Sequence, residues 1–215
     1  MATIDSITLQ VADPTAAANF YRDAFGLDAP LRFQASDDPT TGFRGFTLSI
    51  TVPQPADVRA LVDDAVAAGA EPVKPVEKTF WGVGGVLRAP DGTLWKIATS
   101  AKKDSGPATR TIDKLVLLLG ATDVAVSKRF YVEHGFVVAK SFGRKYVEFE
   151  SSASPVTLAL YGRRALAKDA GVAPDGDGSH RLAIAGDARA FADPDGFAWE
   201  PAPAQVREEV AEADV

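Results

Sequence analysis

The sequence predicts an α+β protein made of two related halves, each assembled from short blocks of strands and helices. Three observations support this prediction. Of the 215 residues, 46% are apolar, which is enough to build a core. Segments with the two-residue period of a half-buried strand alternate with segments that have the period of an amphipathic helix. The same short motifs also recur in the same order at spacings of 104–110 residues, which indicates an internal duplication.

The first half opens with a strand followed by a capped helix. Ser6 and Gln10 alternate with apolar residues, as in a strand with one buried face. Asp13 can accept a hydrogen bond from the first turn of the helix, Pro14 suits its first position, and Gly26 is expected to end it. Further strands are expected at 31–35, 46–52, 73–76, 85–89 and 94–98, with a second helix over 55–69.

The second half repeats this order with one helix fewer. A strand over 112–119 precedes a helix over 123–134. The short stretch 186–190 stands where the second helix would be, so that helix is expected to be absent. The remaining strands are expected at 136–141, 144–150, 155–161, 180–185 and 197–201, with a loop over 169–179.

The recurring motifs define the division of the chain. The matching pairs are residues 4–9 with 112–117, Phe20-Tyr21 with Phe130-Tyr131, and 89–96 with 193–200. A stretch rich in Lys, Ser, Gly and Pro separates the two halves, as expected for a linker. We therefore expect domains at 1–100 and 111–202, a linker at 101–110, and an acidic tail at 203–215.

Composition excludes several classes of function. The 23 basic and 29 acidic residues give a net charge of −6 with no basic stripe, so we expect no nucleic-acid partner. Cysteine is absent, which removes disulfides, thiolate ligands and a cysteine nucleophile. His134 and His180 are the only histidines. Because no run of 18 apolar residues occurs and the N-terminus is typical of a strand, we expect no membrane span and a cytoplasmic location.

The repeated motifs resemble those of the vicinal oxygen chelate superfamily, which includes glyoxalase I, bleomycin-resistance proteins and extradiol dioxygenases. The resemblance covers most of residues 3–201. It implies tandem domains, each built from two βαβββ modules whose sheet curves around a cleft. Both halves are shorter than this layout, so both domains are expected to be truncated. The motifs are Phe20-Tyr21, Gly26 and Pro90-Asp91-Gly92-x-x-Trp95, with their counterparts Phe130-Tyr131, Gly135 and Asp193-Pro194-Asp195-Gly196-x-x-x-Glu200.

The resemblance also implies positions for a divalent metal, which in the superfamily is held by His, Gln or Glu side chains and polarises oxygens of the substrate. In the first domain the first, third and fourth of these positions fall on Ser6, Thr47 and Lys96, and the second, a carboxylate at the end of the first module, has no clear counterpart. Hydroxyl groups are poor ligands for such a metal, and a protonated lysine repels it. We therefore expect no metal in a cleft built from these residues alone.

In the second domain the same positions fall on Lys114, near Leu158, on His180 and on Glu200. Two alternatives remain open. His180 and Glu200 could form a site for one divalent metal (Zn, Ni, Mn or Fe), joined by Ser6 if modules of different domains share a site. Otherwise they are a remnant, with His180 bonded locally and Glu200 paired with Lys114.

Other residue types suggest a site without a metal. Lys96 and Lys114 could act as a base or as a Schiff-base nucleophile if a cleft desolvates them, and otherwise they are ion-paired lysines. Phe80 and Trp81 lie in a glycine-rich loop and are candidates for a cleft wall. Tyr161 is a candidate for lining the cleft opening.

The leading hypothesis is a glyoxalase/bleomycin-resistance-like protein that binds a small organic molecule, such as a metabolite or antibiotic, in a β-sheet cleft without a complete metal site. The first alternative is a metal-dependent lyase, isomerase or dioxygenase that uses His180 and Glu200. The second is a non-catalytic dimerisation scaffold. The sequence leaves open whether the modules pair within or across the domains, and whether the chain forms a homodimer.

Overall fold

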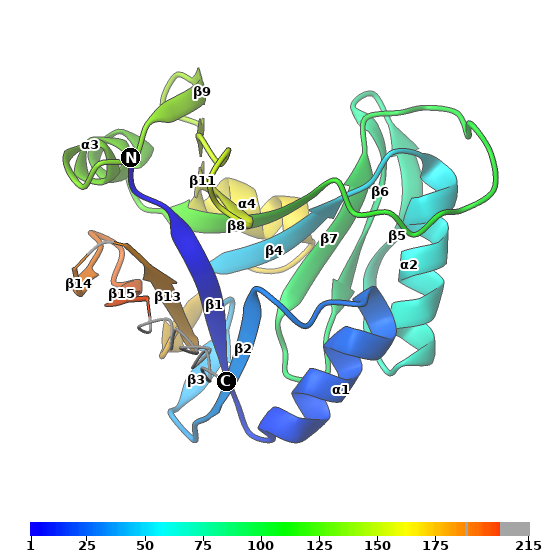
Figure 1. Ribbon diagram of the computed structural model, residues 1–215, viewed down its shortest axis with the longest axis horizontal. Coiled ribbons are helices and arrows are strands. Elements are labelled where there is room, and N and C mark those ends of the chain that lie inside the picture. The colour runs from blue at the N-terminus through cyan, green and yellow to red at the C-terminus, as the bar shows by residue number, and fades with distance from the viewer. Residues whose placement is uncertain (188, 203–215) are drawn as a thin grey trace, which may run out of the picture.

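The computed structural model describes residues 1–187 and 189–202 (Figure 1). The described chain forms an eight-stranded sheet, a five-stranded sheet and a two-stranded ribbon, together with four helices. The strands and helices follow one another in four blocks, which we call the first to fourth modules. This order confirms the α+β class expected from the sequence.

The first module contains the capped helix that the sequence predicts. Its elements are β1 (Ile4–Val11), α1 (Pro14–Phe25), β2 (Leu31–Ala35) and β3 (Thr40–Gly42). Asp13 Oδ1 accepts a hydrogen bond from the Ala16 amide at 3.0 Å, which satisfies a free donor in the first turn of α1. Gly26 ends the helix.

The second and third modules have the full order of one strand, one helix and three strands. The second contains β4 (Phe46–Thr51), α2 (Pro55–Ala67), β5 (Glu71–Thr79), β6 (Gly82–Arg88) and β7 (Leu94–Thr99). The third contains β8 (Lys114–Ala121), α3 (Val124–Glu133), β9 (Val138–Phe142), β10 (Tyr146–Phe149) and β11 (Val156–Gly162), followed by α4 (Arg163–Ala170).

The fourth module is strand-rich. Its elements are β12 (Gly176–Gly178), β13 (Leu182–Gly186), β14 (Phe191–Ala192) and β15 (Ala198–Pro201). Among the described residues, no helix lies between β13 and β14, as the sequence led us to expect. None of the helices in the described part of the chain is long and apolar enough to cross a membrane.

Each sheet combines modules from both halves of the sequence. The eight-stranded sheet has the order β5-β6-β7-β4-β8-β11-β10-β9, so it joins the second module to the third. The five-stranded sheet has the order β14-β15-β13-β1-β2 and joins the first module to the fourth. Leu48 of β4 lies opposite Leu117 of β8, and Ile7 of β1 lies opposite Ile184 of β13, with both pairs antiparallel. The structure therefore shows pairing across the two halves, which the sequence left open.

The main core lies on one face of the eight-stranded sheet. Leu48, Trp95 and Leu117 on that face pack with Ile7 and Ile184 of the five-stranded sheet, and all five are fully buried. Helices α1, α2 and α3 contribute buried side chains to the same core, whereas α4 lies on the opposite face (Figure 1). Burial of this apolar surface is the main force that holds the two sheets together.

The repeated motifs meet inside this core. Tyr21 of α1 donates its hydroxyl hydrogen to Asp91 Oδ2 at 2.8 Å and accepts a hydrogen bond from Trp95 Nε1 at 3.2 Å. Burial raises the pKa of Tyr21, so the hydroxyl stays neutral and can donate. The network thus ties the helix of one module to the closing turn and strand of another. The second copy consists of Tyr131, Asp193 and Trp199, with distances of 2.7 and 3.2 Å.

The connection between β7 and β8 is held against the N-terminus of α2. Gln54 Oε1 accepts a hydrogen bond from the Ser105 amide at 2.7 Å. Asp57, which is fully buried, accepts hydrogen bonds from the amides of Thr109 and Arg110 at 2.5 and 2.8 Å. Burial alone would raise the pKa of Asp57, but these hydrogen bonds outweigh it and lower the pKa.

Replacing Tyr131 by Phe should lower the free energy of unfolding by about 1–3 kcal/mol, because Asp193 and Trp199 would lose a buried hydrogen-bond partner. Urea unfolding measures the difference. Tyr161→Phe is the matched control, since the Tyr161 hydroxyl makes no hydrogen bond to another described residue. Equal stability of the two variants would show that the network contributes nothing.

Asp57→Asn should lower the free energy of unfolding by about 2 kcal/mol at neutral pH. Because the pKa of Asp57 is lower in the folded state, its contribution is present above the unfolded pKa of about 3.9 and is lost as the pH falls through the folded value. Urea titrations between pH 3 and 7 should therefore show a gap between wild type and variant that closes on acidification. Asp63→Asn, at an exposed position of the same helix, should show no such gap.

Candidate functional site

The face of the eight-stranded sheet opposite the main core carries α4. Leu166 and Ala170 of α4 are buried against Val86 of β6 and Leu94 of β7, with Phe43 at the edge of this cluster. In the superfamily that the sequence resembles, this is the face expected to enclose the cleft. The centre of the expected cleft is therefore occupied by a helix of the chain itself.

Two lysines from the sheet hold the C-terminal end of α4. Lys74 of β5 donates hydrogen bonds to the main-chain oxygens of Lys168 and Asp169 at 2.8 and 2.6 Å. Lys96 of β7 forms an ion pair with the Asp169 carboxylate at 2.6 Å. Cations are favoured at this end of a helix because its free carbonyl groups carry partial negative charge.

Helix α4 was not predicted from the sequence, since it has only eight residues and few large apolar ones. A weak signal was nevertheless present. Leu166 and Ala170 are one helical turn apart, which places them on one face. Gly171 follows with the positive φ of 79° that commonly ends a helix, a conformation in which other residues are strained.

Helix α4 and the residues after it border two cavities over β6 and β7 on this face of the sheet. One, the Lys96 cavity, has a volume of about 440 Å³ and lies over β5, β6 and β7 beside Asp169. The other, the Arg88 cavity, has a volume of about 400 Å³ and lies near the turn between β6 and β7. Both are within the size range of small-molecule sites, about 300–1,000 Å³.

The lining of the Lys96 cavity is more apolar than polar. Val86 and Ala98 contribute apolar surface, and Gly82, Gly84 and Gly85 of β6 also line the cavity. A side chain at Gly82 would collide with the Thr99 carbonyl oxygen of β7. Only glycine therefore fits at this position of β6. Trp81 forms one wall, and the Lys96–Asp169 ion pair supplies a cation and an anion at the other end.

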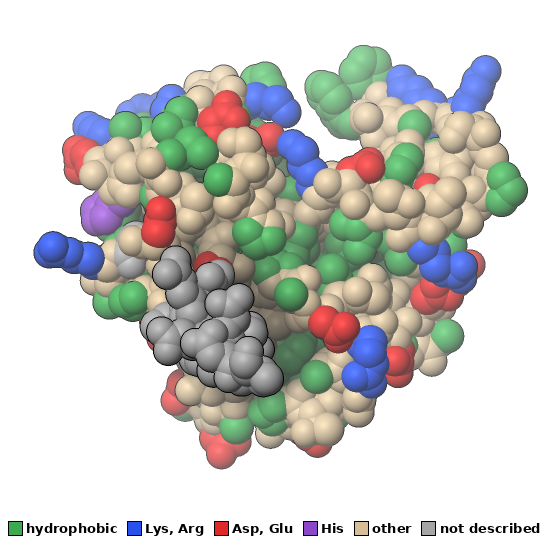
Figure 2. Space-filling model, in the orientation of Figure 1, with side chains coloured by type: hydrophobic (Ala, Val, Ile, Leu, Met, Phe, Trp, Pro, Cys, Tyr) green, Lys and Arg blue, Asp and Glu red, His purple; other side chains and the backbone are tan. Residues whose placement is uncertain are grey.

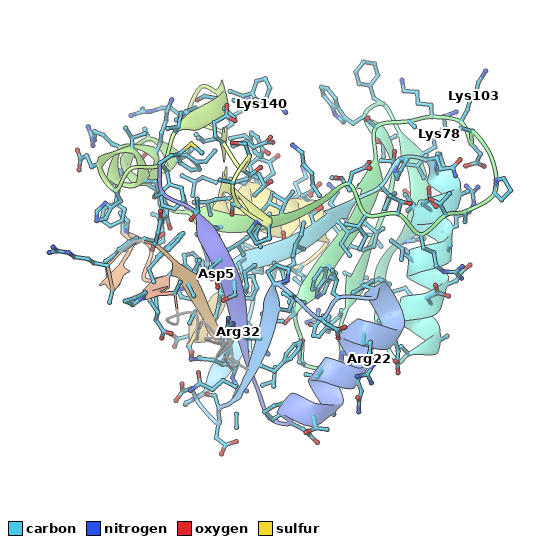
Figure 3. All side chains as sticks on the ribbon, viewed as in Figure 1. Asp5, Arg22, Arg32, Lys78, Lys103 and Lys140 are labelled. Atoms are coloured by element: carbon cyan, nitrogen blue, oxygen red, sulfur yellow. The ribbon has the colours of Figure 1, made fainter. Side chains whose placement is uncertain are left out.

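The turn between β5 and β6 presents two aromatic side chains to solvent. Phe80 and Trp81 are 78% and 82% exposed, and Lys102 Nζ lies 5.1 Å from the centre of the Phe80 ring. Figure 2 shows hydrophobic side chains beside basic ones at the upper right, at the top of the lobe that contains β5, β6 and β7. Lys78 and Lys103 extend from the same lobe in Figure 3. Trp81 thus lines the Lys96 cavity, whereas Phe80 is directed to solvent at the tip.

Three further predicted residues lie on the cleft face but outside the two cavities. Thr47 of β4 is buried opposite Leu118 of β8. Tyr161, at the end of β11, packs against the apolar cluster under α4. Lys114 lies at the start of β8, where its Nζ is 3.8 Å from Glu148 Oε1. The expected partner Glu200 belongs to the other sheet, so the pairing of Lys114 with Glu200 is wrong.

Glu148 is a candidate residue that was not predicted from the sequence. Its side chain is only 15% exposed, and besides Lys114 it contacts Lys140 Nζ at 3.3 Å and accepts a hydrogen bond from the Tyr146 hydroxyl at 2.9 Å. Burial and this carboxylate raise the pKa of Tyr146. Lys140 reaches from β9 into this group at the top of the lobe opposite Lys78 (Figure 3). Lys140 and Glu148 lie opposite each other in the hairpin formed by β9 and β10. The sequence signal for this contact is the short turn between two predicted strands, which brings the two residues together.

The remaining predicted residues lie at the five-stranded sheet. Ser6 of β1 and Glu200 of β15 both stand opposite Ala185, so their backbones are two strand spacings, or about 10 Å, apart. His180 precedes β13 and stacks on Phe197 with ring centres 4.1 Å apart.

Both ring nitrogens of His180 are already used. Nδ1 lies 2.5 Å from the Arg44 carbonyl oxygen, and Nε2 lies 3.1 Å from that of Asp195. Glu200 points to the side of β15 opposite the buried Trp199. Within residues 1–187 and 189–202, no group of three or more His, Asp or Glu side chains could hold a metal ion. The residues present therefore do not fit a divalent metal.

No family model matches the sequence, and no curated protein does. The fold does match solved structures. Glyoxalase I from Zea mays superposes with a TM-score of 0.59 at 16% identity over 93% of this chain and 91% of that protein. A glyoxalase/bleomycin resistance protein/dioxygenase family enzyme from Burkholderia phytofirmans has 23% identity and a TM-score of 0.43, over 46% of this chain and 100% of its own.

The likeness to glyoxalase I extends over nearly the whole length of both chains. At this level of identity the likeness establishes the fold alone. The chain therefore has the vicinal oxygen chelate fold in its tandem form, as the repeated sequence motifs predicted.

Leu166→Ala should lower the free energy of unfolding by about 2–4 kcal/mol, because Leu166 is 1% exposed and fills the centre of the cleft face. The exposed neighbour Arg164 provides the control, and Arg164→Ala should change stability by less than about 0.5 kcal/mol. Chemical unfolding compares the two. A similarly small effect of Leu166→Ala would mean that α4 is not packed in the cleft.

Proposed function

We propose that the chain binds a small, flat organic molecule in the Lys96 cavity. The observation that supports this proposal is an apolar slot of about 440 Å³ with an aromatic wall and one ion pair at its end. Sites for small molecules combine apolar walls with a few placed polar groups in this way. The proposal agrees with the leading hypothesis from the sequence.

The shape and chemistry of the slot suggest the class of ligand. The lining glycines add no side chains to the cavity, which leaves room for a ring, and Trp81 can stack on the edge or face of that ring. Lys96 can donate to a carbonyl or carboxylate group of the ligand, while Asp169 can accept from an adjacent hydroxyl. We assign these two residues to positioning the ligand, in a protein that works in solution in the cytoplasm.

A thermal-shift screen of metabolites and antibiotics, enriched in planar aromatic acids, tests the proposal. A binder should stabilise the wild type but not Ala98→Phe, because a phenyl ring at position 98 would fill the slot. Trp81→Ala should weaken binding about fivefold to tenfold through lost stacking, whereas Phe142→Ala, at an exposed aromatic on β9, should not. Binding that survives Ala98→Phe would place the ligand elsewhere.

A separate measurement, of metal content, addresses the metal-dependent alternative. Purified protein should retain no stoichiometric metal after loading with Zn, Ni, Mn or Fe(II) and dialysis, as measured by elemental mass spectrometry. This expectation follows from the His180 ring nitrogens, which are engaged by carbonyl oxygens. About one metal per chain, lost in His180→Ala, would instead support a lyase, isomerase or dioxygenase.

The position of α4 favours a second candidate function, a non-catalytic dimerisation scaffold. A cleft filled by Leu166 and its neighbours leaves less room for a substrate than an open one. This alternative predicts a concentration-dependent dimer in sedimentation experiments and no compound that stabilises the wild type. A binder sensitive to Ala98→Phe would rule it out as the sole function.

A further inference from the structure

The Arg88 cavity is separate from the proposed ligand site. It lies beyond α4 on the same face of the sheet, next to the turn between β6 and β7, and has a volume of about 400 Å³. Phe43, Leu94 and Val172 supply apolar walls. Arg44 and Arg88 supply two positive charges to the same space.

Arg88 has no partner within the described part of the chain. It is the last residue of β6 and is partly buried, and its guanidinium makes no hydrogen bond or ion pair with another described residue. A guanidinium that loses water on burial needs acceptors for its five N–H groups. The cavity beside it is where such an acceptor can enter.

Arg44 is anchored but not neutralised. Its Nη2 donates to the Asp91 main-chain oxygen at 2.7 Å. Its other side-chain N–H groups donate to no other described residue, so they can donate to a ligand. The Asp91 carboxylate is already engaged, because its two oxygens accept from the Tyr21 hydroxyl and the Thr93 amide. Burial lowers the pKa of Arg44, Asp91 opposes this, and nearby arginines including Arg88 lower it further. Arg44 and Arg88 thus bring two like charges to the lining of one cavity.

One carboxylate also lines the cavity. Asp175 forms no ion pair within 4.0 Å with Arg44 or Arg88, and its side chain makes no hydrogen bond to another described residue. Its main-chain oxygen accepts from the Phe43 amide at 2.9 Å, which holds the backbone in place. The cavity thus offers two cationic donors and one anionic acceptor that do not satisfy one another.

We infer that the Arg88 cavity is a binding site for a small organic oxyanion, a carboxylate or phosphate group held by Arg88 and Arg44. Such groups suit arginine because two N–H donors can meet two oxygens in one plane. Asp175 accepts from a hydroxyl or ammonium group elsewhere on the ligand and disfavours ligands with several negative charges. This site is additional to the proposed function, since α4 separates it from the Lys96 cavity.

Calorimetric titration with inorganic phosphate, and separately with succinate and glycolate, tests the inference at a constant ionic strength set with sodium chloride. At least one of these probes should bind the wild type, and the arm that responds distinguishes phosphate from carboxylate chemistry. Arg88→Gln should weaken that binding at least tenfold, as expected for loss of a hydrogen bond between charged groups. Asp175→Asn should tighten it by removing a repulsive charge.

Arg129→Gln is the matched control, because Arg129 is an exposed arginine on α3, and no residue of α3 lines the Arg88 cavity. It should leave the dissociation constant unchanged. Ala98→Phe, which fills the Lys96 cavity, should also leave it unchanged, so that failure of the proposed function is distinguishable from failure of this inference. No binding of any probe, or binding unaffected by Arg88→Gln, would overturn the inference.

Discussion

The antiparallel pairing of β4 with β8 is the constraint on which the rest of the structure depends. These strands lie at the centre of the eight-stranded sheet and join the second module to the third. The connection between β7 and β8 brings the chain back beside β4. Asp57 holds the backbone of this connection, and the Asp113 amide donates to the Thr51 carbonyl oxygen at 2.8 Å. A slip of one residue here would turn Leu117 from the core to the cleft face.

The position of α4 follows from this junction. It leaves β11 beside β8 and crosses the cleft face towards β7, where Lys74 and Lys96 meet its C-terminal end. The result is a cleft divided into two cavities of different chemistry, one with an ion pair and one with two arginines. The fold matches that of solved glyoxalase I, and the residues that line these cavities set the chemistry of this face, which agrees with the rule that function depends on the site rather than on the fold.

The parts of the fold that the sequence predicted are those with local or repeated signals. The residues of the two Tyr–Asp–Trp networks belong to the repeated motifs, such as those that contain Tyr21 and Trp95. The duplication could therefore be recognised from the sequence. The pairing across halves was not readable, because alternation in a strand shows which face is buried and not which strand lies beside it. Helix α4 was missed since its stability comes from contacts with distant residues such as Lys96. The predicted site residues lie on two different sheets because their positions were assigned half by half, whereas the modules pair across the two halves.

The account is tested most directly by an NMR titration of isotope-labelled protein with the compound that gives the largest thermal shift. If the cleft face of the eight-stranded sheet is the ligand site, backbone amide shifts should change around residues 82–86 and 96–98 and at Asp169. Amides around Ser6, His180 and Glu200 should not move. Changes centred on those three residues, with none on β6 and β7, would contradict the account and assign binding to the five-stranded sheet.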